Sequence, residues 1–421
     1  MGRTAAWYCP WVAAGAIRDA GIGLVSEPPS EAVVTLPSPI PGQAADVLPV
    51  TLGAGDAVGI EIAAIVRRGD SPAIVEFDDG PAGVGFVMWG DGLLTADRCV
   101  GSAPKSWHLP GGTTATGFTT ELRLFNPFAE LARVDVQALS EFGAEALPEF
   151  EGVAVAPGSW ETLDLGIPLP LRDVLSVSVE ARNGLVIPSL VVTGGGDEAS
   201  WPGSGVDRLW EFPVSTVGGL EGFLTVSNPH ETPTRVLVDV YGPEGAFEEA
   251  AAVDVEPLTS TRLVLAELGT GPMGVRVRAD QTVGATVEAR PPVPAEDTTP
   301  DPGEPGSPEE APAPRGLAGT VGVRPSDRWL VPATGALEDA GVTIWILNAS
   351  PTSVTVTVDP LGPGDPPPDK VVVEAGTVLG IAAIVDEDVE GYVVAASGPV
   401  SVAVSFVDER GVAFAAGIPV R

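Results

Sequence analysis

Short runs in which apolar and polar residues alternate fill most of the chain, and glycine, proline or asparagine residues separate them. Residues 132–139 (ARVDVQAL) form the clearest run, because every second position is apolar. A period of two is expected of a β-strand that buries one face. Such runs, with turns at roughly 8–12-residue intervals, predict an antiparallel β-sandwich with about seven strands in each domain.

A tryptophan followed three positions later by a proline recurs four times at domain-sized intervals. The four pairs are Trp7 with Pro10, Trp107 with Pro110, Trp210 with Pro213, and Trp329 with Pro332. An asparagine follows the last three tryptophans by 18 or 19 residues, at Asn126, Asn228 and Asn348, and ends the second predicted strand. A period near one hundred residues is the size of a domain. We therefore predict an all-β chain of four tandem immunoglobulin-like antiparallel β-sandwich repeats.

The domain boundaries follow from this period. We expect β-sandwich repeats at 1–104, 105–207, 208–290 and 316–421, the first of them irregular because prolines interrupt its strands. Residues 291–315 hold nine prolines and six acidic residues, which predicts an extended acidic linker. The first three repeats, which have almost no linker between them, are expected to stack as a rod that carries the fourth repeat at its end.

Each repeat is also expected to close with a β-hairpin. The turns would fall near residues 78–80, at Asn183-Gly184, near Asp280 and near residues 397–399. Asn-Gly between alternating runs is the strongest of these signals, since both residues readily take positive φ.

The charge of the chain limits its partners. The 421 residues include 57 acidic residues against 22 Lys and Arg, for a net charge of −35. Such a surface repels nucleic acid and anionic lipid, so we expect no nucleic-acid partner. No apolar run reaches the roughly 18 residues of a membrane-spanning helix, so no transmembrane segment is expected. The first residues show no hydrophobic signal region, which leaves either an intracellular protein or one whose leader peptide is missing.

The sequence contains little that would support catalysis or metal binding. His108 and His230 fall in different repeats, and neither lies near a G-x-S-x-G motif. Residues 194–197 (GGGD) lack the Lys-Ser/Thr of a phosphate-binding loop. The acidic residues at 78–79 and 386–388 do not form a D-x-D-x-D-G calcium loop. We therefore expect no catalytic residue, no metal site, no cofactor and no enzymatic activity.

The only two cysteines, Cys9 and Cys99, lie 90 residues apart at the two ends of the first repeat. First and last strands of a sandwich often end near each other, so we expect a disulfide, as in secreted proteins. The alternative is a pair of reduced, buried thiols.

The repeated tryptophans also allow two interpretations. Each can pack over its own sandwich or against the next domain, or it can present its ring to a sugar or a cation. A fixed place in every repeat favours the structural role. The asparagines at the strand ends are expected to bond nearby backbone in turns.

Several motifs resemble those of one family. The residues WYCP at 7–10, the second cysteine, SWHLPGGT at 106–113 and LFNP at 124–127 are similar to an uncharacterised domain-of-unknown-function family. Its members are secreted or envelope-anchored proteins of high-GC Gram-positive bacteria. The resemblance implies export and no known activity, ligand or catalytic residue.

We therefore expect a secreted or cell-envelope protein that acts as a non-enzymatic structural or adhesion module, as a multi-domain spacer or scaffold. Its partner would be an unknown envelope protein or glycan. The alternative is a carbohydrate-binding protein that recognises cell-wall or capsular glycan through exposed tryptophan and aspartate.

Overall fold

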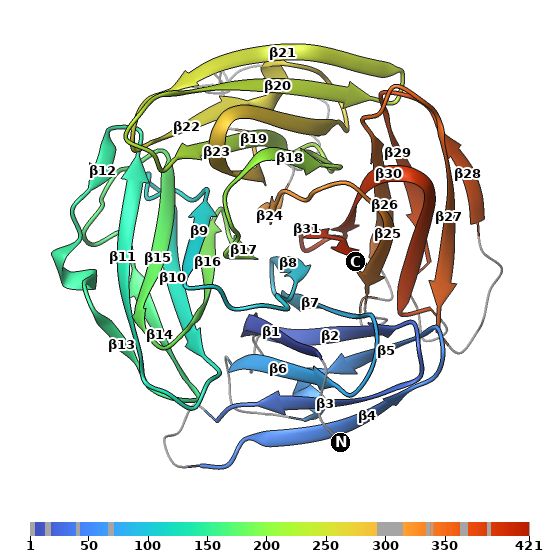
Figure 1. The fold of residues 1–421 in the computed structure, drawn as a ribbon, viewed down its shortest axis with the longest axis horizontal. Helices are drawn as coiled ribbons and strands as arrows, with labels where there is room; N and C mark the ends of the chain where they lie inside the picture. Colours follow the sequence, from blue (N-terminus) through green and yellow to red (C-terminus); the bar gives the residue numbers. More distant parts are fainter. Residues whose placement is uncertain are drawn as a thin grey trace, which may run out of the picture.

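The computed structural model describes residues 5–12, 18–38, 43–65, 71–292, 315–333, 337, 340–362, 369–384 and 389–420. The described residues form antiparallel β-sheets throughout, which confirms the all-β prediction (Figure 1). Three single 3-10 turns are the only named helical elements in these ranges: η1 (Ile62–Ala64), η2 (Pro148–Phe150) and η3 (Leu265–Glu267).

The strands fall into four consecutive groups. The first repeat holds β1 (Ala5–Val12), β2 (Arg18–Ser26), β3 (Ser30–Leu36), β4 (Asp46–Leu52), β5 (Asp56–Glu61), β6 (Ser71–Phe77), β7 (Ala82–Gly90) and β8 (Leu93–Arg98). The second holds β9 (Ser106–Pro110), β10 (Phe118–Asn126), β11 (Ala132–Ser140), β12 (Gly143–Glu145), β13 (Val153–Val155), β14 (Ser159–Asp164), β15 (Leu175–Asn183), β16 (Ile187–Gly194) and β17 (Asp197–Pro202). The third holds β18 (Asp207–Phe212), β19 (Glu221–Asn228), β20 (Thr234–Gly242), β21 (Gly245–Val255), β22 (Thr259–Val264), β23 (Gly274–Arg290) and β24 (Ala318–Val321). The fourth holds β25 (Ser326–Pro332), β26 (Gly341–Asn348), β27 (Val354–Leu361), β28 (Asp369–Val373), β29 (Thr377–Ala383), β30 (Gly391–Val407), β31 (Val412–Ala416) and β32 (Ile418–Pro419).

One strand order recurs in all four repeats. In the first repeat one sheet runs β1-β6-β3-β4 and the other runs β5-β2-β7-β8. The second repeat repeats this as β9-β15-β11-β12 and β14-β10-β16-β17. In the third and fourth repeats the long strands β23 and β30 each pass through both sheets and take the place of the sixth and seventh strands.

This order differs from the immunoglobulin-like order that we expected. In an immunoglobulin sandwich the seventh strand pairs with the sixth. Here β7 pairs with β2, and its equivalent in the second repeat, β16, pairs with β10. The predicted closing hairpins at residues 78–80 and at Asn183-Gly184 are wrong for the same reason. The strands on either side of each turn lie in different sheets, so the chain crosses the sandwich there. The hairpins that do form are β7–β8 in the first repeat and the equivalent β16–β17 in the second.

The third repeat continues in the sequence beyond the Pro-rich segment. Residues 293–314, most of the predicted linker, fall outside the described residues. The strand that follows, β24, pairs with residues 286–289 of β23 and completes the third repeat. The predicted start of the fourth repeat at residue 316 is therefore corrected, because residues 318–321 belong by hydrogen bonding to the sheet of the third.

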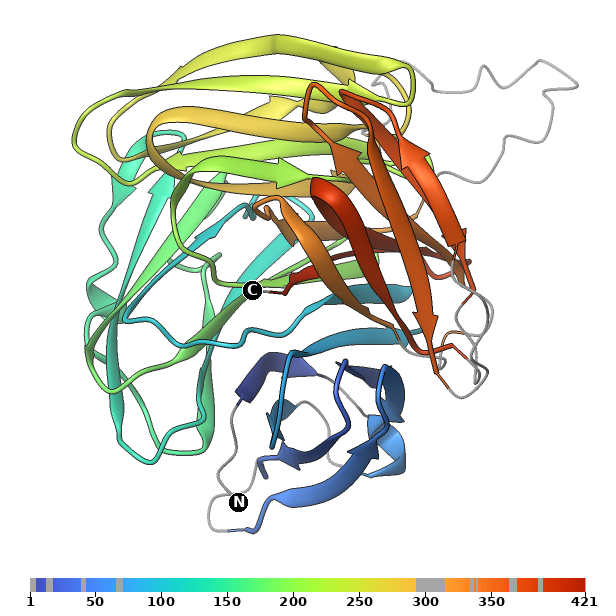
Figure 2. The ribbon, with the colours of Figure 1, turned by 45° about the vertical axis from the view of Figure 1, so that its right-hand side comes forward.

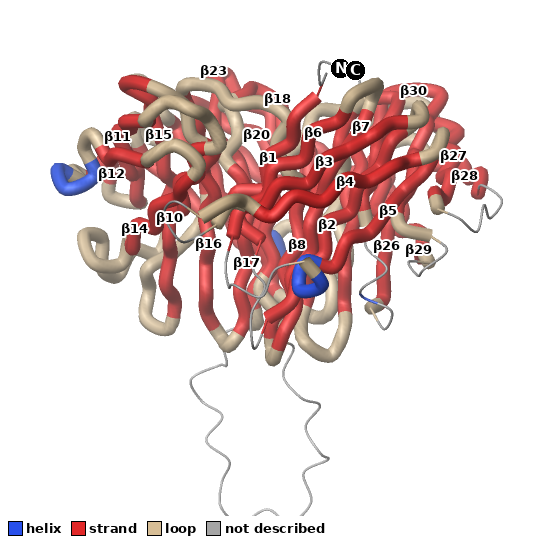
Figure 3. The backbone as a smooth tube through the Cα atoms, turned by 90° about the horizontal axis from the view of Figure 1, so that it is seen from below, coloured by secondary structure: helices blue, strands red, loops and turns tan. Residues whose placement is uncertain are grey.

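The four repeats surround a common axis like the blades of a propeller (Figures 1 and 2). The strands equivalent to β8 in the other repeats are β17, β24 and β31. These four strands lie nearest the axis, and each packs on the next, with β31 returning to β8. Every residue of β17, β24 and β31 is buried. Strands buried on both faces need partners on both sides, and the adjoining repeats supply them. The predicted rod is therefore wrong, and the repeats form a ring that is broad and short in side view (Figure 3).

Side-chain packing closes the ring between the first and fourth repeats, a contact that we call the closing seam. One apolar cluster joins Val87 and Leu94 of the first repeat to Trp329 and Val331 of the fourth. A second cluster joins Val25 to Leu330 and Ile418.

Candidate functional site

Three of the four repeated tryptophans are structural in their contacts. Trp107, Trp210 and Trp329 are buried, and each indole N–H donates a hydrogen bond to a backbone carbonyl across its own repeat. Of the prolines, Pro110 and Pro332 end β9 and β25, Pro213 follows β18, and Pro10 lies inside β1. These positions support the structural interpretation for three of the four tryptophan–proline pairs.

The repeated asparagines hold the turns that follow the second strands. Asn126, Asn228 and Asn348 are fully buried, and each side-chain amide donates to carbonyls of two separate segments. Each side-chain oxygen accepts the backbone N–H two residues further on, as in an Asx-turn.

Trp7 differs from its three counterparts. Its side chain is only partly buried, and its indole N–H makes no hydrogen bond to any residue that the structure describes. It borders a groove of about 420 Å³ at the closing seam. We call this the Trp7 groove; its principal lining residues are Trp7, Pro81, Leu330, Ile418, Pro419 and Val420.

An ion pair lies beside the Trp7 groove and bridges the closing seam. Arg328 donates to the carboxylate of Glu27. The backbone of Glu27 bonds the carbonyl of Pro81, and the N–H of Val420 bonds the carbonyl of Arg328, so both partners are tied to residues that line the groove. The residues that line the groove are therefore apolar or glycine, and the ion pair is the neighbouring polar group.

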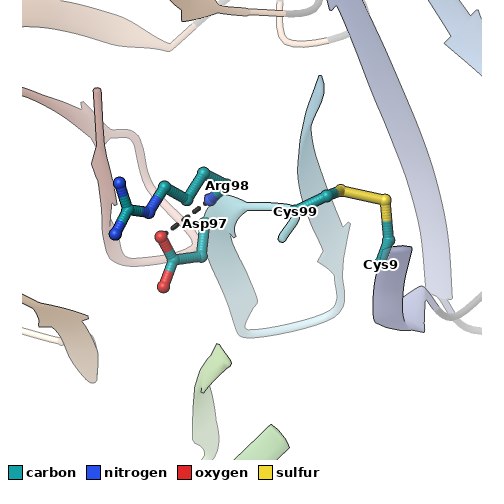
Figure 4. The surroundings of a disulfide bond; sticks show 4 residues. All are labelled: Cys9, Asp97, Arg98 and Cys99. Carbon is teal, nitrogen blue, oxygen red and sulfur yellow. Dashed lines mark hydrogen bonds between the residues drawn. A yellow bond between two sulfur atoms is a disulfide. The ribbon is translucent and has the colours of Figure 1, made fainter. Parts of the chain in front are cut away.

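The predicted disulfide between Cys9 and Cys99 is confirmed (Figure 4). Both cysteines are buried, and the bond joins β1 to the residue that follows β8. Figure 4 shows Asp97 and Arg98, the last two residues of β8, directly before Cys99. Arg98 donates to the carbonyl of Gly417 in the fourth repeat. The disulfide therefore anchors the strand that carries part of the closing seam.

Asp97 is a buried carboxyl group on this strand. One oxygen accepts the N–H groups of Arg98 and, at 3.5 Å, Ala416, while the other has no hydrogen-bond partner among the described residues. Burial raises the pKa of Asp97 to about 7, although Arg98 acts against it. The folded protein therefore favours the protonated form of Asp97 relative to the unfolded chain.

This pKa predicts a pH dependence of stability. The pKa of Asp97 in the folded protein lies above the ordinary value of 3.8. The contribution of Asp97 to the free energy of unfolding is therefore fully present below pH 3.8, and it is lost as the pH rises towards 7. Between pH 5 and pH 8, the wild-type free energy of unfolding should fall by about 3 kcal/mol relative to that of Asp97→Asn. Urea denaturation of both proteins at each pH measures this. The exposed Asp79→Asn serves as control and should track wild type, and parallel curves for Asp97→Asn and wild type would contradict the assignment.

Asp197 joins three repeats near the axis. Its carboxylate accepts the N–H groups of Leu94 in the first repeat at 3.1 Å, Glu198 in its own repeat at 2.7 Å and Leu317 in the third at 2.8 Å. Burial raises the pKa of Asp197 to about 7 in spite of these three donors.

Buried glutamates lie at three of the junctions between repeats. Glu198 pairs with Arg18 between the first two repeats, Glu288 accepts the N–H of Gly112 between the second and third, and Glu211 accepts the hydroxyl of Ser401 between the third and fourth. Burial acts to raise the pKa of Glu288, but Arg290 and Arg262 outweigh it and hold the pKa below its ordinary value. These groups were not predicted from the sequence; a single acid inside a largely apolar run, as at Glu288 within residues 283–289, was the available signal.

The two histidines influence each other electrostatically although they belong to different repeats. Burial lowers the pKa of His108; Glu180 acts against this shift, and His230 adds to it. The His230 ring lies 2.9 Å from the carbonyl oxygen of Thr282. His108 of the second repeat and His230 of the third therefore interact across the boundary between these repeats, and no serine hydroxyl bonds either ring among the described residues.

The acid clusters considered for calcium give a mixed result. Asp78 accepts the Ser30 hydroxyl at 2.9 Å and the Glu31 N–H at 2.7 Å, which lowers its pKa and gives it a structural role. Residues 386–388 fall outside the described residues. Within the described ranges, no three His, Cys, Asp or Glu residues are grouped as metal ligands.

Fold and site together define a ring-shaped all-β protein of four repeats with an aromatic groove at its closing seam. The model of a family of unknown function, DUF5719, matches residues 89–199, which run from the end of β7 through the second repeat into β17. This match supports the resemblance to an uncharacterised domain family. No curated protein matches the chain. In the parts of the chain that are described, no helix is long and apolar enough to cross a membrane.

Proposed function

We propose that this protein is a non-enzymatic extracellular or cell-envelope adhesion module that acts as a rigid scaffold. The observation that carries the proposal is the closed ring itself, in which buried carboxyl groups and apolar seams join each repeat to the next. A ring does not lengthen with each repeat as a rod does. The closed ring therefore supports the role of a compact scaffold, which holds surface groups in fixed positions, over the role of a spacer.

The buried disulfide supports a location outside the cytoplasm. Structural disulfides persist in oxidising compartments and are rare in the cytosol. The high negative charge keeps such a protein soluble and disfavours anionic partners.

Sedimentation with isolated cell envelopes of the native host tests the proposal. The purified full chain should co-sediment in a saturable manner, and heat-unfolded chain serves as the control for non-specific adsorption. A chain that stays in the supernatant, and that fractionates with the cytoplasm in intact cells, would refute the adhesion role.

Carbohydrate binding is a second candidate function, because the partly exposed Trp7 supports it. The two candidates are compatible, since a glycan can be the envelope component to which the scaffold attaches.

A further inference from the structure

We propose that the Trp7 groove binds a neutral carbohydrate chain, with a sugar ring stacked on Trp7 and sugar hydroxyls bonded to Glu27 and Arg328. This inference rests on the proposed adhesion function and names its ligand class.

The four equivalent tryptophans differ in their surroundings. Trp107, Trp210 and Trp329 have satisfied indole N–H groups and buried rings. Trp7 occupies the same place in its repeat, yet it keeps part of its ring exposed and its N–H without a partner among the described residues. Tryptophan combines a large apolar face with one donor, which suits a ligand that has an apolar face and hydroxyl acceptors. A sugar ring has both.

The size and lining of the Trp7 groove suit a small ligand. Its volume of about 420 Å³ lies within the range of small-ligand sites, roughly 300–1,000 Å³. Pro81, Leu330, Ile418 and Pro419 provide a rigid apolar wall, because neither proline has rotatable side-chain freedom to lose on binding. An apolar site with a few fixed polar groups is the usual form of a specific binding site.

Charge and polar groups next to the groove favour an uncharged ligand. Glu27 and Arg328 pair with each other, with exposed fractions of 20% and 47% for their side chains, so together they offer both acceptors and donors to a ligand without a net charge. Asp79, next to groove residue Gly80, is also exposed. A chain with a net charge of −35 repels acidic glycans and anionic lipids, which leaves neutral sugars as the favoured class.

A proline-rich peptide is the main competing occupant, because aromatic grooves also bind polyproline II segments. Such peptides are recognised chiefly through apolar contact and need no ion pair at the groove edge. The fixed pair of Glu27 and Arg328 therefore favours the sugar.

Isothermal titration calorimetry of the full chain tests the inference. The probes are neutral hexasaccharides of glucose, mannose, galactose and N-acetylglucosamine, together with a proline-rich decapeptide. We expect at least one hexasaccharide to bind. Trp7→Ala should weaken that binding by at least about tenfold, which corresponds to the loss of one good stacking contact.

A second variant guards against misfolding of Trp7→Ala. Glu27→Gln keeps the shape of the side chain, which is 20% exposed, and removes one ion pair of the closing seam; it should lower the melting temperature only slightly while weakening sugar binding several-fold. Trp160→Ala, in the partly buried strand β14 of the second repeat, is the matched control and should bind like wild type.

Absence of binding to every hexasaccharide, equal binding by wild type and Trp7→Ala, or binding of the peptide alone would each overturn the inference. If the chain still co-sediments with envelopes in those cases, the adhesion role stands and only its ligand is reassigned. If neither sugars nor envelopes bind, both proposals fail.

Discussion

Replacing Trp329 with alanine should lower the free energy of unfolding by about 3–5 kcal/mol. The side chain is fully buried in the apolar cluster that joins the fourth repeat to the first. Its indole N–H donates to the carbonyls of Val400 and Ser326, at 3.1 Å in each case. The substitution therefore opens a cavity and also leaves a carbonyl such as that of Val400 without its partner, and both effects destabilise the folded state.

The equivalent changes Trp107→Ala and Trp210→Ala should have effects of similar size, because both rings are buried and both indoles bond a carbonyl. Phe142→Ala is the control, since that ring is 75% exposed and its loss should change stability by less than about 0.5 kcal/mol. Denaturant titrations of the four variants measure these differences. Near-neutral results for all three tryptophans would refute their structural role.

Removal of the disulfide should be the second large effect. The chain-entropy model assigns a loop of 90 residues a stabilisation of up to about 4.6 kcal/mol. Because Cys99 directly follows the strand that contacts Ala416 and Gly417, the Cys9→Ala/Cys99→Ala variant should also loosen the closing seam. Hydrogen exchange should therefore increase in β31 of the fourth repeat as well as in β8 of the first.

Two measurements check this prediction. A thiol count on unfolded, unreduced protein from the native host should find no free thiol. Addition of reductant should lower the denaturation midpoint of wild type and leave that of the double variant unchanged. Two free thiols in the native protein, or equal midpoints with and without reductant, would contradict a stabilising disulfide.

Local signals in the sequence predicted the parts of the fold that depend on neighbouring residues. The alternation in residues 132–139 predicted β11, because the side chains of a strand alternate between two faces whatever the strand pairs with. Asn228 and Asn348 marked strand ends, because a short amide side chain bonds backbone two residues away. Cys9 and Cys99 could be paired because no other cysteine competes with them.

Local signals were insufficient to predict which strands pair with each other. Asn183-Gly184 has the composition of a hairpin turn, and Gly184 does take a positive φ of 63°. Yet β15 pairs with β11 and β9, while β16 pairs with β10 and β17. A turn sequence determines that the chain reverses or bends, whereas sheet twist and the packing of the two sheets decide whether the next strand joins the same sheet.

The sequence by itself determined that this chain is all-β, that a unit of about one hundred residues recurs, and that the two cysteines pair. Only the tertiary structure decided that the repeats close into a ring, that residues 318–321 complete the third repeat, and that Trp7, unlike its three buried counterparts, is partly exposed and borders a groove. The physical reason is the distance along the chain over which each contact forms. Strand alternation and turn chemistry act over a few residues, but the contacts of Asp97 with Ala416 and of Glu27 with Arg328 join residues about three hundred positions apart, and no local pattern encodes them.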